Sequence, residues 1–183
     1  MVKFILGEKV KMTQMFDNEG NAYPATLVLA EPNEITQIKT EEKDGYVSVQ
    51  VSLGKKKKEF RLDMADDFKA GNKIDVAVFE EGDKVRVSGI SKGKGFQGVV
   101  KRHGFKGGPR THGQKHSERE AGSIGDKGAA KVFKGRKMPG RMGSDRVTVK
   151  NLKILKVDKE ENLLLVSGAI PGKRGTLVEI RSI

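Results

Sequence analysis

Three glycines near the middle of the chain have the spacing of a dinucleotide-binding turn. Gly93, Gly95 and Gly98 form the pattern G-x-G-x-x-G directly after an expected strand. In a dinucleotide-binding fold this turn opens a helix whose N-terminus holds the pyrophosphate. The glycines and the proline within residues 99–109 prevent a useful helix here, and the chain lacks alternating strands and helices. We therefore expect no nucleotide site and predict no cofactor.

The same residues resemble the start of the base-stacking strand in an RNA-recognition motif. The run Lys94-Gly-Phe-Gln-Gly-Val99 supplies the basic residue, the glycine and one aromatic residue. That motif needs further aromatic side chains on the same strand to stack bases. Gln97 and Gly98 stand where those aromatic residues belong. Base stacking by this mechanism is therefore not expected.

Histidine and serine residues near the middle of the chain have the types needed for metal binding or nucleophilic catalysis. His112 and His116 are four residues apart, but a glycine lies between them and no helical periodicity surrounds them. The third histidine of the chain, His103, is distant in sequence. Histidines that are neutral or contact phosphate are favoured over metal ligands. Ser117 and Ser123 lack a base and a group to orient it. We therefore predict no metal site, no catalytic residue, no small-molecule substrate and no enzyme.

The positive charge is concentrated in one segment. Residues 91–150 hold 16 Lys and Arg against four Asp and Glu, an excess equal to the whole net charge of +12. Thirteen of the 23 glycines lie in the same segment. Apolar residues such as Phe96 and Phe133 recur among the glycines, which suits a segment ordered by an anionic partner. A permanently disordered basic loop is the alternative that composition leaves open.

Several classes of protein are excluded by what the chain lacks. Without cysteine there is no disulfide scaffold and no thiolate metal site. No apolar run is long enough to cross a membrane, and the apolar start is too short for a signal peptide. A second basic run, Lys55–Lys58, follows a glycine and is most simply a solvated hairpin loop, with a phosphate contact as the alternative.

Outside the basic segment the sequence predicts strands. Residues Tyr46–Leu53 alternate strictly between apolar and polar side chains. Shorter alternating runs predict strands at residues 74–79, 84–88 and 146–150, and continuous apolar runs predict strands buried on both faces at residues 25–29 and 162–166. One or two helical turns are compatible with residues 63–68. Many short strands at close spacing favour a mainly β fold, an antiparallel β-barrel into which the long basic, glycine-rich loop is inserted.

A set of motifs in fixed order resembles one protein family. The motifs are Ser91–Gly98, Lys101–Phe105, Gly122–Gly125, Val132–Gly135 and Lys137–Gly143, with supporting blocks at Met12–Phe16, Arg146–Val149 and Asn162–Gly172. Together they resemble the large-subunit ribosomal protein family L-three, in its short bacterial form. The resemblance covers nearly the whole chain.

The resemblance implies an architecture and a function. It implies a translation-protein-type barrel built from residues 1–90 and 147–183, with residues 91–146 as an extended loop that penetrates ribosomal RNA. The expected function is that of a structural constituent of the large ribosomal subunit in the cytoplasm. Its expected partners are large-subunit rRNA near the 3′ end and neighbouring large-subunit ribosomal proteins, and the loop is expected to support the peptidyl-transferase centre and early assembly. A free-standing nucleic-acid-binding module, such as an assembly factor, is the alternative.

The resemblance also implies individual rRNA-binding residues. Lysines and arginines are expected to contact phosphates, and glycines to let the backbone approach them closely. The part of the loop that leaves the barrel, here called the outgoing arm, supplies Lys92, Gly93, Lys94, Gly95, Phe96, Gly98, Lys101, Arg102, His103 and Lys106. The more variable stretch after it supplies Arg110, His112, Lys115 and His116. The part that leads back to the barrel, here called the return arm, supplies Lys131, Phe133, Lys134, Lys137 and Arg141. Phe96, Phe105 and Phe133 either stack on bases or pin the two arms together, and both alternatives stay open.

The chain departs from the family at the loop tip. Family members have a threonine-proline-glycine stretch, one residue longer, where this chain has Asp126–Ala130. We therefore expect a reshaped tip, and no methylated glutamine because none stands there. Lys11 also replaces a glycine that the family has before Met12.

Overall fold

A computed structural model of the protein describes residues 2–17, 19–65, 68–126 and 128–183. The chain divides into two compact units. The first, here called the body, comprises residues 1–91 and 146–183, and the second, here called the insertion, comprises residues 92–145. Each unit is described by itself.

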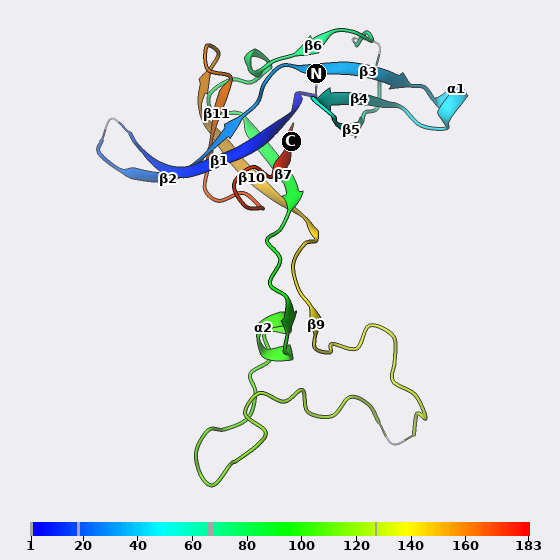
Figure 1. The fold of residues 1–183 in the computed structure, drawn as a ribbon, viewed down its shortest axis with the longest axis vertical. Coiled ribbons are helices and arrows are strands. Elements are labelled where there is room, and N and C mark those ends of the chain that lie inside the picture. The colour runs from blue at the N-terminus through cyan, green and yellow to red at the C-terminus, as the bar shows by residue number, and fades with distance from the viewer. Residues whose placement is uncertain (1, 18, 66–67, 127) are drawn as a thin grey trace. The chain divides into compact units, whose positions relative to one another are not determined.

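Six antiparallel strands of the body form a closed barrel (Figure 1). In their order around the barrel they are β1 (Phe4–Phe16), β12 (Leu177–Ser182), β7 (Lys84–Ile90), β10 (Arg146–Asp158), β11 (Leu163–Ser167) and β2 (Ala22–Leu29). The mainly β fold and the barrel that the sequence predicts are therefore confirmed. Residues of every strand fill the interior, among them Ile5, Val28, Val85, Val87, Ile154, Leu164 and Ile180.

A second sheet in the body has the strand order β5-β4-β3-β6 (Figure 1). Its strands are β3 (Asn33–Lys39), β4 (Ser48–Leu53), β5 (Lys56–Arg61) and β6 (Lys73–Ile74), and the short helix α1 (Glu41–Asp44) lies between β3 and β4. Strand β1 belongs to two cores, because Ile5 faces the barrel interior while Phe4 and Leu6 join the core of the second sheet. The Phe4 ring stacks on Phe60 of β5 with 4.5 Å between ring centroids.

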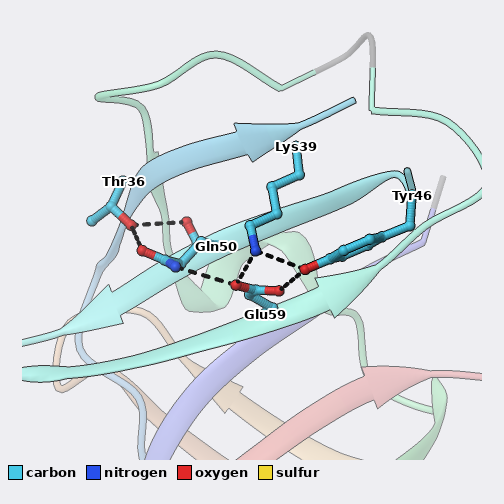
Figure 2. Close-up of polar contacts among 5 residues, drawn as sticks. All are labelled: Thr36, Lys39, Tyr46, Gln50 and Glu59. Carbon is cyan, nitrogen blue, oxygen red and sulfur yellow. Dashed lines mark hydrogen bonds and ion pairs between the residues drawn. The ribbon is translucent and has the colours of Figure 1, made fainter. Parts of the chain in front are cut away.

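A polar network lies across β3, β4 and β5 (Figure 2). Lys39 donates to the hydroxyl of Tyr46 at 2.6 Å and forms an ion pair with Glu59 at 2.9 Å. Tyr46 and the Gln50 amide donate to the same carboxylate at 3.0 and 3.3 Å, and Thr36 donates to Gln50. The hydrogen bond from Lys39, followed by that from Tyr46, lowers the pKa of Glu59. The carboxylate of Glu59 is therefore fully engaged within the sheet.

The prediction of a strand at residues 74–79 is wrong beyond its first residue. Strand β6 ends at Ile74, and residues Val76–Val78 form the 3-10 helix η1. The Asp75 carboxylate accepts the backbone N–H of Ala77 at 3.0 Å, a local bond that competes with strand pairing. Val76 and Phe79, three residues apart, then both enter the barrel core.

The other predicted strands are present, with changes in their bounds and burial. The alternating run from Tyr46 gives β4, and the runs at 84–88 and 146–150 lie within β7 and β10. The apolar run at 25–29 lies in β2, and residues 163–166 of the second run lie in β11. Both runs contain partly buried residues, so these strands are not buried on both faces. No helix includes residues 63–65 or 68, and residues 66 and 67 of that prediction lie outside the described residues.

The insertion contains little regular structure. Its elements are β8 (Phe96–Gln97), the one-turn helix α2 (Val99–His103) and β9 (Gly140–Arg141). Strands β8 and β9 pair with each other as a separate two-stranded sheet (Figure 1).

Candidate nucleic-acid interface

Backbone hydrogen bonds hold the two arms of the insertion in antiparallel register. Phe96 lies opposite Arg141, and Gln97 lies opposite Gly140. The ladder continues where the N–H of Lys94 donates to the Met142 carbonyl at 2.9 Å and the N–H of Met142 donates to the Gly95 carbonyl at 3.0 Å. Because main-chain atoms make these contacts, the side chains of Lys94 and Arg141 stay exposed to solvent.

Gly143 is required by the close approach of the two arms. Its φ of 80° lies in the left-handed region, and a Cβ at this position would overlap the carbonyl oxygen of Lys92. Gly95 on the opposite arm also has a positive φ, of 68°, but a Cβ there would meet no atom within 4 Å. The structure thus gives a steric reason for the glycine at position 143.

Two side chains at the end of helix α2 contact the backbone of the return arm. The sequence leads us to expect no useful helix here, and the helix that forms is one turn long because Gly104 ends it in the left-handed conformation. Arg102 donates through Nη1 to the carbonyl of Met138 at 2.8 Å, and the Nε2 of His103 lies 2.9 Å from the same oxygen. A carbonyl oxygen only accepts, so this His103 nitrogen carries the hydrogen. Two residues expected at phosphates are therefore engaged with protein backbone.

Gly140 lets the Arg102 guanidinium lie against the return arm. A Cβ on Gly140 would come within 2.6 Å of Arg102 Nη1. The sequence does not mark Met138 and Gly140 as partners of the outgoing arm, because Met138 makes the contact through its backbone carbonyl and Gly140 through having no side chain. Both do lie in the motif Lys137–Gly143.

The stretch between the two arms folds back on itself at residues 107–118. The N–H of Gly108 donates to the carbonyl of Glu118 at 3.0 Å, and the Glu118 carboxylate pairs with Nε of Arg110 at 2.6 Å. A Cβ on Gly107 would overlap the same Glu118 carbonyl oxygen. Arg110 thus has an acidic partner within the protein. Arg110, His112 and His116 are all exposed to solvent.

The remaining predicted cations are exposed to solvent. None of them forms an ion pair with a carboxylate in the described part of the chain. They are Lys92, Lys94, Lys101, Lys106, Lys115, Lys131, Lys134, Lys137 and Arg141. The structure therefore leaves a set of flexible cations available on both arms, together with the exposed glycines Gly93, Gly95 and Gly98.

The aromatic residues of the insertion differ in their surroundings. Phe96 is 76% exposed and Phe133 is 59% exposed, so neither side chain pins the two arms together. Phe105 is partly buried, and its ring centroid lies 6.1 Å from that of His103.

Near the tip, the side chain of Arg136 crosses between two parts of the insertion. Its Nη2 donates to the carbonyl of Ser123, and the hydroxyl of Ser123 donates to the Gly125 carbonyl at 2.8 Å. Arg136 stands between two of the quoted motifs and was not among the predicted residues. Residue 127 belongs to the tip that we expect to be reshaped, Asp126–Ala130, and lies outside the described residues.

The described residues include no group of three or more His, Asp or Glu residues arranged to hold a metal ion. In the same part of the chain, no helix is long and apolar enough to span a bilayer.

Comparison with known proteins identifies the family. The model of the family described as ribosomal protein L3 matches residues 26–163. The proteins named large ribosomal subunit protein uL3 from Carboxydothermus hydrogenoformans and Marinobacter nauticus are 45% and 46% identical, covering 99% and 97% of this chain and 97% and 96% of those proteins. The protein of the same name from Rhodococcus erythropolis is 48% identical over 99% of this chain and 94% of its own length. With a family match over most of its residues and such relatives along nearly its full length, the chain belongs to the ribosomal protein L3 family.

Proposed function

We propose that this protein is a structural constituent of the large subunit of the cytoplasmic ribosome and binds large-subunit rRNA through its insertion. Its family is one of structural ribosomal components, which supports this function over catalysis. The observation that carries the proposal is the arrangement of the two arms: backbone bonds join them, while lysines on both arms remain exposed. Cations presented in this way neutralise phosphates without needing a fixed side-chain geometry.

The finer parts of the proposal follow the family resemblance. The insertion binds rRNA near its 3′ end, supports the RNA of the peptidyl-transferase centre and helps nucleate subunit assembly. Neighbouring large-subunit ribosomal proteins contact the body. Phe96 and Phe133 stack on bases, since their exposure leaves both rings available.

Binding to large-subunit rRNA in the presence of excess tRNA tests the proposal. If the insertion contacts about 6–10 phosphates, the logarithm of the affinity falls with the logarithm of salt concentration with a slope of roughly −5 to −9. Arg141→Ala and Lys134→Ala each reduce the magnitude of that slope by about 1. Arg110→Ala is the matched control and has a smaller effect, because Arg110 is already paired with Glu118.

Two results would contradict the proposal. Equal competition by tRNA would mean that the insertion is a nonspecific basic loop. An effect of Arg110→Ala as large as that of Arg141→Ala would show that the cations without an acidic partner have no special role.

A further inference from the structure

Two arginines face each other across neighbouring barrel strands of the body. Arg86 of β7 lies directly opposite Arg181 of β12 in the strand register. Their neighbours in sequence, Val85, Val87 and Ile180, point into the barrel core, so both arginine side chains lie on its outer face. Both residues are partly buried. Like charges directly opposite each other on two strands destabilise a sheet, so this pairing calls for a compensating partner.

Among the residues that the structure describes, no side-chain acceptor pairs with these two guanidinium groups. In the described part of the chain, neither Arg86 nor Arg181 donates a side-chain hydrogen bond or forms an ion pair within 4.0 Å. Burial, and then the positive charge of Arg86, lower the pKa of Arg181, while the negative charge of Asp63 acts in the opposite direction. Partly buried guanidinium donors without an acceptor are costly unless a ligand satisfies them.

The two arginines line a depression that is also lined by other hydrogen-bond donors. It lies between the outer face of β7, β10 and β12 and the edge strand β5, and is also lined by Arg61, Ser88 and Thr148. The hydroxyls of Ser88 and Thr148 are 2.8 Å apart. Arginine forks and hydroxyl groups are the side chains that bind phosphate oxygens in protein–RNA complexes.

The acidic residues of this depression are already occupied. The Glu59 carboxylate is held by Lys39, Tyr46 and Gln50 (Figure 2). The Glu179 carboxylate accepts from Arg146 and also lies 3.8 Å from Nζ of Lys58. Neither carboxylate therefore neutralises Arg86 or Arg181, and the depression keeps an excess of positive charge.

We propose that a phosphate group of the RNA backbone binds between Arg86 and Arg181 on the outer face of the barrel. This inference rests on the proposed rRNA-binding function and adds a contact made by the body, separate from those of the insertion. A phosphate diester has two non-bridging oxygens that share its single negative charge. One oxygen can accept from each guanidinium, and the negative charge relieves the repulsion between them.

The test compares Arg86→Gln and Arg181→Gln with the control Arg174→Gln, all in the full chain. Arg174 is exposed on a turn of the body and is neither opposite another arginine nor part of the depression. Each of the two test variants lowers the affinity for large-subunit rRNA by about tenfold and reduces the salt slope by about 1. Their thermal unfolding temperatures stay at or above that of the unchanged protein, because the like-charge pair is removed.

Arg86→Lys provides a second variant in which the charge is kept. It retains the salt slope but loses part of the affinity, because an ammonium group lacks the planar fork of arginine. Affinities of Arg86→Gln and Arg181→Gln equal to that of the unchanged protein or of Arg174→Gln overturn the inference, and would assign the pair to another anion such as a carboxylate of a neighbouring protein. If Arg141→Ala still weakens binding in that case, the proposed function stands and only this contact is lost.

Discussion

Asn33 links two strands of the body through its side chain. It is fully buried, its Oδ1 accepts the N–H of Leu6 at 2.6 Å, and its amide donates to the carbonyls of Leu6 and Glu31 at 3.1 and 2.8 Å. The amide group thereby satisfies both main-chain groups of one residue of β1. Strand β1 is held in this way at the point where its side chains alternate between the two cores.

Replacing Asn33 with alanine should destabilise the body. The change leaves the N–H and carbonyl of Leu6 buried without partners, which we expect to lower the free energy of unfolding by about 1–3 kcal/mol per unsatisfied group. Urea unfolding followed by circular dichroism measures the loss. Asn72→Ala, at an exposed position, is the control. Equal stability of the two variants would show that the Asn33 amide is not needed.

Only some of the residues that matter for the structure can be predicted from the sequence. The exposed lysines of the insertion stand out by type and number. Asn33 and the pair Arg86 and Arg181 do not, because their roles depend on which strand lies opposite them. Strand register is set by the whole sheet and cannot be obtained from single positions.

At the scale of elements, the ladder between the two arms depends on glycine. Gly143 has a left-handed backbone, and a side chain there would overlap the Lys92 carbonyl. The neighbouring bonds between Lys94, Gly95 and Met142 would then have to shift or open.

We expect Gly143→Ala to separate the arms locally. Adding a Cβ costs roughly 1 kcal/mol for the left-handed backbone, besides the steric overlap. Amide hydrogen exchange at Lys94 and Met142 should become faster, and rRNA affinity should fall. Gly125→Ala is a matched control, since Gly125 has no positive φ and its added Cβ would meet no atom within 4 Å. Unchanged exchange rates in Gly143→Ala would contradict the steric argument.

The sequence predicted strands well where alternation was long and poorly where local hydrogen bonds competed. Strict alternation from Tyr46 to Leu53 leads to β4, which pairs with β3 on one side and with β5 on the other. The shorter run after Ile74 has the same apolar pattern, but the Asp75 side chain turns the backbone into a 3-10 helix. A three-residue period and a two-residue period cannot be told apart over so few positions.

At the scale of the whole molecule, strand register predicts that the body can fold without the insertion. Ile90 at the end of β7 lies directly opposite Arg146 at the start of β10. A two-residue Asn-Gly turn can join such a pair as a hairpin. The two-part construction of the body from residues 1–90 and 147–183 thus remains a prediction that one deletion tests.

Removing residues 91–145 and joining Ile90 to Arg146 through Asn-Gly should give a folded β protein. We expect strand-type circular dichroism, cooperative thermal unfolding, and a large loss of rRNA affinity and of salt dependence. The measurement is made beside the full chain under identical conditions. An unfolded product would contradict the division of the chain, and unchanged rRNA binding would contradict the role of the insertion.

The pairing of β12 has a consequence for the newly made polypeptide. Strand β12 closes the barrel by pairing with β1 on one side and β7 on the other. It is also synthesised after every other barrel strand. Until translation reaches it, β1 and β7 each keep an unpaired edge that is open to aggregation. The basic insertion is synthesised before β12, so its cations are part of the nascent chain before the barrel is complete.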